Sequence, residues 1–184
     1  LVGSEMCIRD RAKAMIAFAM AMLIVAGEID LSVGAIIALA STVMGLAMAA
    51  GASTPVLVAL GLGTGVLCGA FNGLLVARFG LPSIVVTIGT MSLFRGVSYI
   101  VLGDGAFTGY PDSFAWFGQG YVFWVITVEL VIFALAALVF GVLLHRTSFG
   151  RMVQAIGNNA TAARFSGIRI ERVRFILFLL TGLM

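Results

Sequence analysis

Long apolar stretches, separated by short polar turns, run through most of the chain. The runs Ala14–Ala26 and Phe175–Met184 are too short to cross a hydrocarbon core, which takes roughly 20 helical residues, so we expect incomplete spans there. Four other runs are long enough: Leu31–Ala50, Pro55–Ala77, Ser83–Leu102 and Tyr121–Leu144. The pattern predicts an all-α fold, a polytopic transmembrane helical bundle with about six membrane segments, the first and the last incomplete.

Composition favours a membrane protein over a soluble one. Hydrophobic residues make up 61% of the 184 positions and charged residues only 10%, which leaves too little polar surface for a soluble domain of this size. The first eleven residues differ abruptly in character from the rest of the chain, and we expect residues 1–11 to be a non-native tail. Residues 12–184 then form the transmembrane domain, which we expect to be incomplete at both ends.

The charges between the last two apolar runs predict the orientation. Residues 145–174 carry six arginines and one acidic residue, and such an excess in a short loop marks the cytoplasmic side. Counting back along the chain puts Gly103–Gly120 outside and the turn Arg78–Pro82 inside. One step further back, the basic residues between 9 and 13 would lie outside, which the same rule disfavours. Either that tail is not native, or Ala14–Ala50 does not form two ordinary spans.

The arginines of this loop could also suggest a nucleic-acid patch. They lie between two apolar runs, however, at the level of lipid headgroups, where anionic lipid is the nearest polyanion. We therefore expect membrane lipid, and no nucleic acid, as a partner of this loop.

Within the loop, the sequence predicts a short helix. Asn158 or Asn159 can cap a helix over Ala160–Ser166, and Gly167 can end it. The helix is either an incidental turn in an interfacial loop or a docking element for a cytoplasmic partner, and composition alone leaves both open.

Glycines recur at every fourth position of the second full span. They are Gly61, Gly65, Gly69 and Gly73, and they form a smooth groove on one helix face where another helix can pack closely. A nucleotide-binding loop is the alternative for the glycine-rich start of this series, but no strand precedes it and it lies inside a span. We expect helix packing.

Polar residues interrupt the apolar pattern at three places. The segment Gly27–Gly34 contains two acidic residues, and Asp30 or Ser32 can cap a new helix, so we expect a helix break that is either a tight surface connection or a polar site at depth. Arg95 and Glu129 fall well inside spans, where a charge needs a partner or an aqueous path. The alternative for these two residues is a structural ion pair, between helices or with missing parts of the chain.

Several of these segments, in order, resemble one family. Residues 27–34 are similar to the Gly-Gly-Ile-Asp-Leu-Ser-Val-Gly signature of permease subunits in ribose-type ATP-binding-cassette (ABC) sugar importers, and differ from it only at Glu28. Further similar blocks occur in the family's order: Asn72–Val76, Leu81–Thr90 with Arg95–Gly96, Thr147–Arg151, Ala155–Asn158 and Ala162–Ile168. Each block is short, but together they are distributed in the family's order along most of the chain, from Gly27 to Ile168.

The resemblance implies partners and sites. The expected partners are cytoplasmic ATP-binding subunits, a second permease subunit in a homodimer or heterodimer, and a periplasmic sugar-binding protein. The loop at 145–174 becomes the ATPase-coupling loop, with Gly157, Asn158, Ala162, Ala163, Arg164, Ser166 and Gly167 as coupling residues. The candidates for the translocation path are Asp30, Ser32, Asn72, Thr87, Thr90, Arg95 and Glu129.

The expected function is import of a monosaccharide, rhamnose or ribose-like, across the bacterial inner (plasma) membrane. Glu28 and the outer-loop segments Gly103–Phe107 and Tyr110–Gln119 look closest to rhamnose-type members, and ribose, xylose and autoinducer-2 permeases share the same blocks. An enzyme is disfavoured because the single histidine, His145, has no acidic or cysteine neighbour, and no cofactor or metal is expected. A secondary transporter or channel without an ATPase is the alternative, but such a carrier would not need the block Asn158–Gly167.

Overall fold

The structure is a computed structural model. It describes residues 2–103, 105, 114, 120–123 and 126–184, and for residues 2–13, 121–123 and 126 it describes the backbone alone. Eight helices of more than one turn occur in this part of the chain: α1 (Val2–Val25), α2 (Val33–Ala49), α3 (Thr54–Phe79), α4 (Ser83–Leu102), α6 (Val128–Arg146), α7 (Ser148–Asn158), α8 (Ala160–Phe165) and α9 (Ile170–Leu183). Two short antiparallel strands, β1 (Tyr121–Phe123) and β2 (Ile126–Thr127), precede α6.

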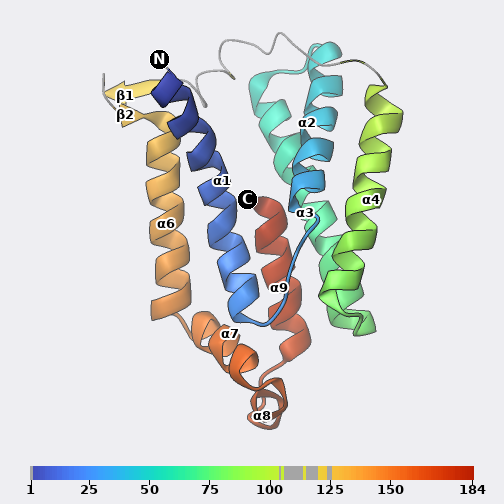
Figure 1. The fold of residues 1–184 in the computed structure, drawn as a ribbon, viewed down its shortest axis with the longest axis vertical. Coiled ribbons are helices and arrows are strands. Elements are labelled where there is room, and N and C mark those ends of the chain that lie inside the picture. The colour runs from blue at the N-terminus through green and yellow to red at the C-terminus, as the bar shows by residue number, and fades with distance from the viewer. Residues whose placement is uncertain (1, 104, 106–113, 115–119, 124–125) are drawn as a thin grey trace.

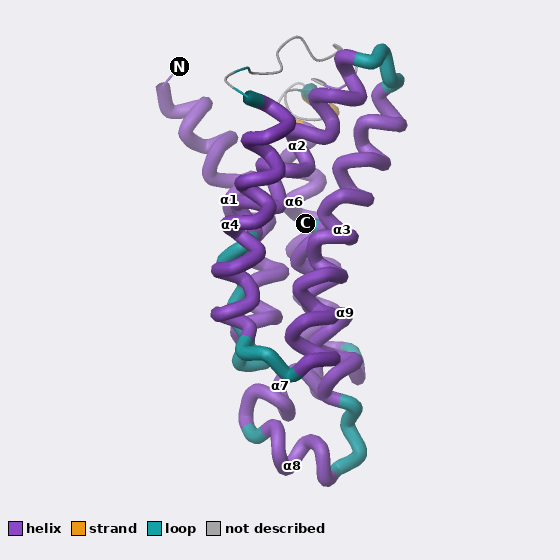
Figure 2. The backbone as a smooth tube through the Cα atoms, turned by 90° about the vertical axis from the view of Figure 1, so that its right-hand side faces the viewer, coloured by secondary structure: helices purple, strands orange, loops and turns teal. Residues whose placement is uncertain are grey.

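The helices form one elongated bundle. The longer helices run roughly along the same axis, while α7 and α8 lie beyond them at one end (Figure 1). Figure 2 shows α8 farthest out at that end. We call this the arginine-rich end, since it carries residues 145–174, and we call α7 with α8 the coupling segment.

The predicted all-α membrane bundle is confirmed. Three helices, α3, α4 and α6, are long and apolar enough to cross a membrane in the described part of the chain. Their outer faces expose large apolar side chains such as Tyr99 (73%), Ile100 (85%) and Leu138 (65%), as expected for surfaces that contact lipid. The predicted span Ser83–Leu102 coincides with α4.

The prediction of a full span at Leu31–Ala50 is wrong. The helix α2 has only 17 residues, because Leu31 and Ser32 belong to the non-helical stretch 26–32 and the helix ends at Ala49. These residues leave α1 near the arginine-rich end and rise to the start of α2 partway along the bundle (Figure 1). One of the two alternatives from the sequence was that Ala14–Ala50 does not form two ordinary spans. The non-helical stretch between α1 and α2 agrees with that alternative. The helix α1 also includes residues 2–11, so the expectation of a non-native tail stays a prediction.

The prediction of a helical span from Tyr121 is also wrong at its start. The helix begins at Val128, seven residues later, after β1 and β2. The run from Tyr121 to Thr127 consists entirely of aromatic and β-branched residues, which favour strands over helices. Glu129 therefore lies in the first turn of α6 rather than well inside a span.

The helix α9 packs along the glycine face of α3. A methyl group added at Gly65 or Gly69 would overlap backbone atoms of α9. A methyl group added at Gly182 of α9 would likewise overlap the backbone of α3 at Gly65. A methyl group at Gly73 would come within 3.1 Å of Phe175 and Phe178 side chains of α9. Gly61 instead faces Met44 of α2. Three of the four glycines therefore serve one helix crossing.

We predict that Gly69→Leu lowers the thermal stability of the purified full-length protein by about 1–3 kcal/mol, since it forces α3 and α9 apart. The matched control is Gly63→Leu on the same helix, because Gly63 is exposed and has open space around it. Equal melting temperatures for the two variants would contradict the packing account.

Candidate functional site

The non-helical residues 26–32, which we call the break segment, connect α1 to α2. Gly27 has φ 81°, a left-handed conformation that favours glycine. The amide groups of Gly27 and Glu28 close the end of α1 by bonding to Ile24 O (2.9 Å) and Leu23 O (3.0 Å). The chain then leaves the helix direction and needs other partners for its polar groups.

Asp30 provides the first of these partners. Its Oδ1 accepts hydrogen bonds from the Ser32 amide (2.8 Å) and the Ser32 hydroxyl (2.7 Å). The Ser32 hydroxyl accepts a hydrogen bond from Asn72 Nδ2 of α3 (2.7 Å). All three side chains are at most 1% exposed. We call Asp30, Ser32 and Asn72 the polar node.

The helix α4 holds the same segment from another side. The Ile29 amide donates to Ser83 Oγ (3.2 Å), and Ile29 O lies 3.5 Å from the Thr87 hydroxyl. Thr87 also donates to Ser83 O (2.8 Å). The break segment is therefore tied to α3 and α4 by hydrogen bonds between residues 40 to 58 positions apart.

The polar node retains hydrogen-bonding capacity. Asp30 Oδ2 and Asn72 Oδ1 are both buried and have no hydrogen-bond partner among the described residues. Both atoms are acceptors, and a buried acceptor without a partner is costly. They can take hydrogen bonds from water or from the hydroxyl groups of a polar solute.

An ion pair joins the break segment to α9. Arg174 Nε lies 2.7 Å from Glu28 Oε1, and the Glu28 side chain is only 8% exposed. By distance this is an ion pair, but the Nε–H group does not point at the carboxylate, since that nitrogen has no hydrogen-bond partner in the described structure. Glu28 is the position that departs from the family signature, and its partner immediately precedes the last apolar run.

The coupling segment has the short helix that the sequence predicts. Asn159, one of the two expected caps, accepts a hydrogen bond from the Ala162 amide (3.0 Å) at the start of α8. Gly167 comes just after α8 and has φ 84°. Ala163 is buried, whereas Phe165 at the tip of the helix is 89% exposed.

The coupling segment also touches the start of the break segment. A methyl group added at Gly157, on α7, would overlap Val25 O and come within 3.6 Å of Ala26 Cα. This contact lets the backbone of α7 meet the last turn of α1 directly. The coupling segment therefore reaches residues 26–32 through the end of α1. A second connection runs through α9, since Arg164 of α8 pairs with Glu171 and Arg174 of α9 pairs with Glu28.

The structure brings together only part of the predicted path. Asp30, Ser32, Asn72 and Thr87 lie around the break segment, whereas Thr90 bonds the Thr87 carbonyl of its own helix (3.3 Å). A pair between Arg95 and Glu129 does not form, because Arg95 is exposed on α4 and Glu129 is buried on α6, across the bundle (Figure 1). Glu129 Oε2 has no hydrogen-bond partner among the described residues.

Sequence reasoning missed several residues of this region. Ser83 bonds the break segment, and Arg174 pairs with Glu28. Phe165 is exposed at the end of α8, and Gly182 packs against the glycine face of α3. The signal for Arg174 was the acidic residue in place of a signature glycine, since a buried carboxylate needs a cationic partner. Phe165 was visible as the large apolar residue within 157–167, a stretch otherwise made of small and polar residues.

Three membrane-length helices and a hydrogen-bonded break beside them are the features of a multi-pass membrane protein. The family model for the permease component of the branched-chain amino acid transport system matches residues 12–184. The chain belongs to this family, whose members are multi-pass proteins of the inner membrane.

Curated proteins with similar sequences are named as permeases of import or transport systems. It is 38% identical over 172 residues to the ribose import permease protein RbsC of Bacillus subtilis, covering 92% of this chain and 53% of the relative. It is 37% identical over 175 residues to the autoinducer 2 import system permease protein LsrD of Yersinia enterocolitica, with the same coverage of 92% and 53%. The galactofuranose transporter permease protein YtfT of Escherichia coli is 34% identical over 185 residues, covering 100% of this chain and 54% of the relative.

The chain thus spans about half the length of the curated relatives it matches. No solved structure matches it.

We predict that Asp30→Ala lowers the melting temperature of the full-length protein, because it leaves the buried Ser32 amide without an acceptor at a cost of about 1–3 kcal/mol. Asp30→Asn retains an acceptor oxygen at this position and should recover most of the loss. Thr64→Ala on α3 is the control, since that hydroxyl bonds only Leu60 O of its own helix and is exposed. A loss in Asp30→Asn as large as in Asp30→Ala would contradict this role.

We predict a coupling energy of about 0.5–3 kcal/mol between Glu28 and Arg174, measured by a double-mutant cycle on stability with Glu28→Gln and Arg174→Gln. The exposed pair Arg164–Glu171, with side chains 67% and 54% exposed, serves as the control and should give less than about 1 kcal/mol. Equal coupling in the two cycles would show that burial of Glu28 does not strengthen its pair.

Proposed function

We propose that the whole protein is the membrane-spanning permease subunit of an ATP-driven importer. One observation carries this proposal: the coupling segment projects beyond the membrane helices at the arginine-rich end (Figure 2), and Phe165, the last residue of α8, is exposed. Family membership and the curated relatives support the same class. A secondary transporter or channel would have no ATPase for this segment to meet.

The coupling segment has the features of a protein-binding element. Phe165 is a large apolar side chain at the tip of a helix outside the main bundle, and exposed aromatic residues are enriched where proteins bind one another. Asn159 and Gly167 fix both ends of α8, so the helix is presented in a defined position. Among the expected coupling residues, Ala162, Arg164 and Ser166 are exposed and able to contact a partner. Ala163 instead packs inward and supports the helix.

In the proposed mechanism, the ATPase moves the coupling segment, and the coupling segment moves the break segment. The direct contact of Gly157 with the end of α1 is one connection, and the Glu28–Arg174 pair is the other. Displacement of residues 26–32 would change the hydrogen bonds of the polar node to α3 and α4. The membrane helices could then open alternately to the two sides.

The proposed solute is a monosaccharide or a similarly small polyhydroxylated molecule. The free acceptors Asp30 Oδ2 and Asn72 Oδ1 suit hydroxyl donors, and the names of the relatives include ribose and galactofuranose. The rhamnose preference rests on Glu28 and on Gly103–Gln119, most of which lies outside the described residues, and it stays a prediction.

The proposed assembly contains separate subunits for the other tasks. ATP hydrolysis takes place in cytoplasmic ATP-binding subunits, so this chain performs no covalent chemistry. A second permease subunit, identical or related, completes the membrane pathway, and a periplasmic binding protein delivers the sugar. Anionic lipid surrounds the arginine-rich end.

The test is capture of the ATPase encoded beside the full-length permease, comparing wild type with Phe165→Ala. Because Phe165 is exposed and packs little against the permease, the variant should insert and fold normally but lose at least about tenfold in affinity, as for an interface hot spot. The readout is the amount of ATPase retained at increasing ATPase concentration.

The matched control is Phe79→Ala, another exposed phenylalanine (66%) at the end of α3 and outside the coupling segment. This variant should bind the ATPase as wild type does. Equal binding by all three proteins would remove the docking role of α8. Failure of the wild type to bind any ATPase, combined with sugar uptake that needs no ATP, would favour the secondary transporter.

A further inference from the structure

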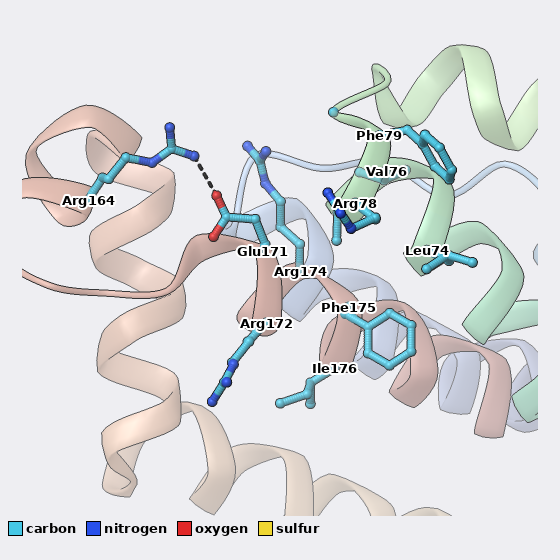
Figure 3. A pocket seen from close by; sticks show the side chains of 12 residues that line it. Leu74, Val76, Arg78, Phe79, Arg164, Glu171, Arg172, Arg174, Phe175 and Ile176 are labelled. Carbon is cyan, nitrogen blue, oxygen red and sulfur yellow. Dashed lines mark hydrogen bonds and ion pairs between the residues drawn. The ribbon is translucent and has the colours of Figure 1, made fainter.

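A cavity of about 780 Å³ opens at the arginine-rich end between the last turn of α3 and the first turn of α9. Four arginines line it: Arg78, Arg164, Arg172 and Arg174. Figure 3 shows these side chains around the same space as apolar side chains of α3 and α9. The cavity therefore combines positive charge with an apolar wall.

Two of the four charges are already neutralised. Arg164 pairs with Glu171 (2.6 Å), and Arg174 pairs with Glu28 (2.7 Å). Arg78 and Arg172 are exposed and have no carboxylate within ion-pair distance in the described part of the chain. The cavity thus has two unneutralised guanidinium groups, which can bind an anionic group with several oxygen atoms.

The position of the cavity indicates the source of that anion. Arg78 lies in the last turn of α3 and Arg172 in the first turn of α9, where the apolar membrane helices meet the polar loop. The adjoining side chains Leu74 (46% exposed), Phe79 (66%) and Ile176 (40%) form an apolar flank that continues along the helices. Headgroups with phosphate lie at this level of a bilayer, and acyl chains lie beside the apolar flank.

We propose that this cavity is a binding site for one anionic phospholipid, in which Arg78 and Arg172 supply the positive charge that attracts the headgroup and Leu74, Phe79 and Ile176 contact the acyl chains. Arg164 and Arg174 keep their own partners and shape the walls of the site. The site uses the membrane placement of the chain and does not depend on the proposed ATP-driven activity.

The test is a titration of the delipidated full-length permease in neutral detergent with phosphatidylglycerol, monitored by the rise in melting temperature. Phosphatidylcholine with the same acyl chains tests the need for net negative charge, and soluble glycerol phosphate tests a free headgroup without chains. We expect stabilisation by phosphatidylglycerol that is clearly greater than by either of the others.

The variant Arg78→Gln/Arg172→Gln should weaken phosphatidylglycerol binding about 30-fold, the effect of two basic groups at a membrane surface. The matched control is Arg146→Gln/Arg169→Gln, which removes the same charge from exposed positions at the same end but outside the cavity. Equal weakening in the two variants would overturn the site in favour of a diffuse charge effect. Stabilisation by phosphatidylcholine as strong as by phosphatidylglycerol would overturn it as well, even if the cavity variant failed to fold.

Discussion

A backbone amide or carbonyl group without a hydrogen-bond partner costs several kcal/mol in hydrocarbon, and this constraint governs the break between α1 and α2. Residues 26–32 leave the helical path, so side chains must replace the missing helix bonds. Asp30 accepts from the Ser32 amide, and Ser83 accepts from the Ile29 amide. Contacts with α3 and α4 hold these bonds in place, so the break exists only within the assembled bundle. The same polar groups that make the break possible give the bundle its buried polar node.

Small residues decide where helices of this bundle touch. Gly65, Gly69 and Gly182 let α3 and α9 approach backbone to backbone, and Gly157 does the same for α7 and the end of α1. Contacts of this kind leave little room for one helix to slide without moving the other. The proposed coupling route uses them: a push on α7 reaches the break segment through the backbone contact at Gly157, and the Glu28–Arg174 ion pair adds a second connection from α9.

Local patterns in the sequence predicted most of the helices. The pairings between distant residues depend on the fold, so the sequence could not show them. Hydrophobic run length predicted α4 to the residue, and cap residues predicted α8, because both signals are local. The start of α6 was missed since a membrane-length apolar run hides strand preference at one end. The Glu28–Arg174 pair joins residues far apart in the sequence, so no local pattern could name the partner. Asp30 was recognisable as a cap, but its bond network to Asn72 required the fold.

In the proposed mechanism, the coupling segment acts on the break segment. This can be measured by amide hydrogen exchange of residues 26–32 in the complete importer, with and without ATP bound to the ATPase. ATP should change the protection of these amides in the wild type, and the change should be lost in Phe165→Ala. An ATP-dependent change in protection of the coupling segment with none in residues 26–32 would contradict the mechanism.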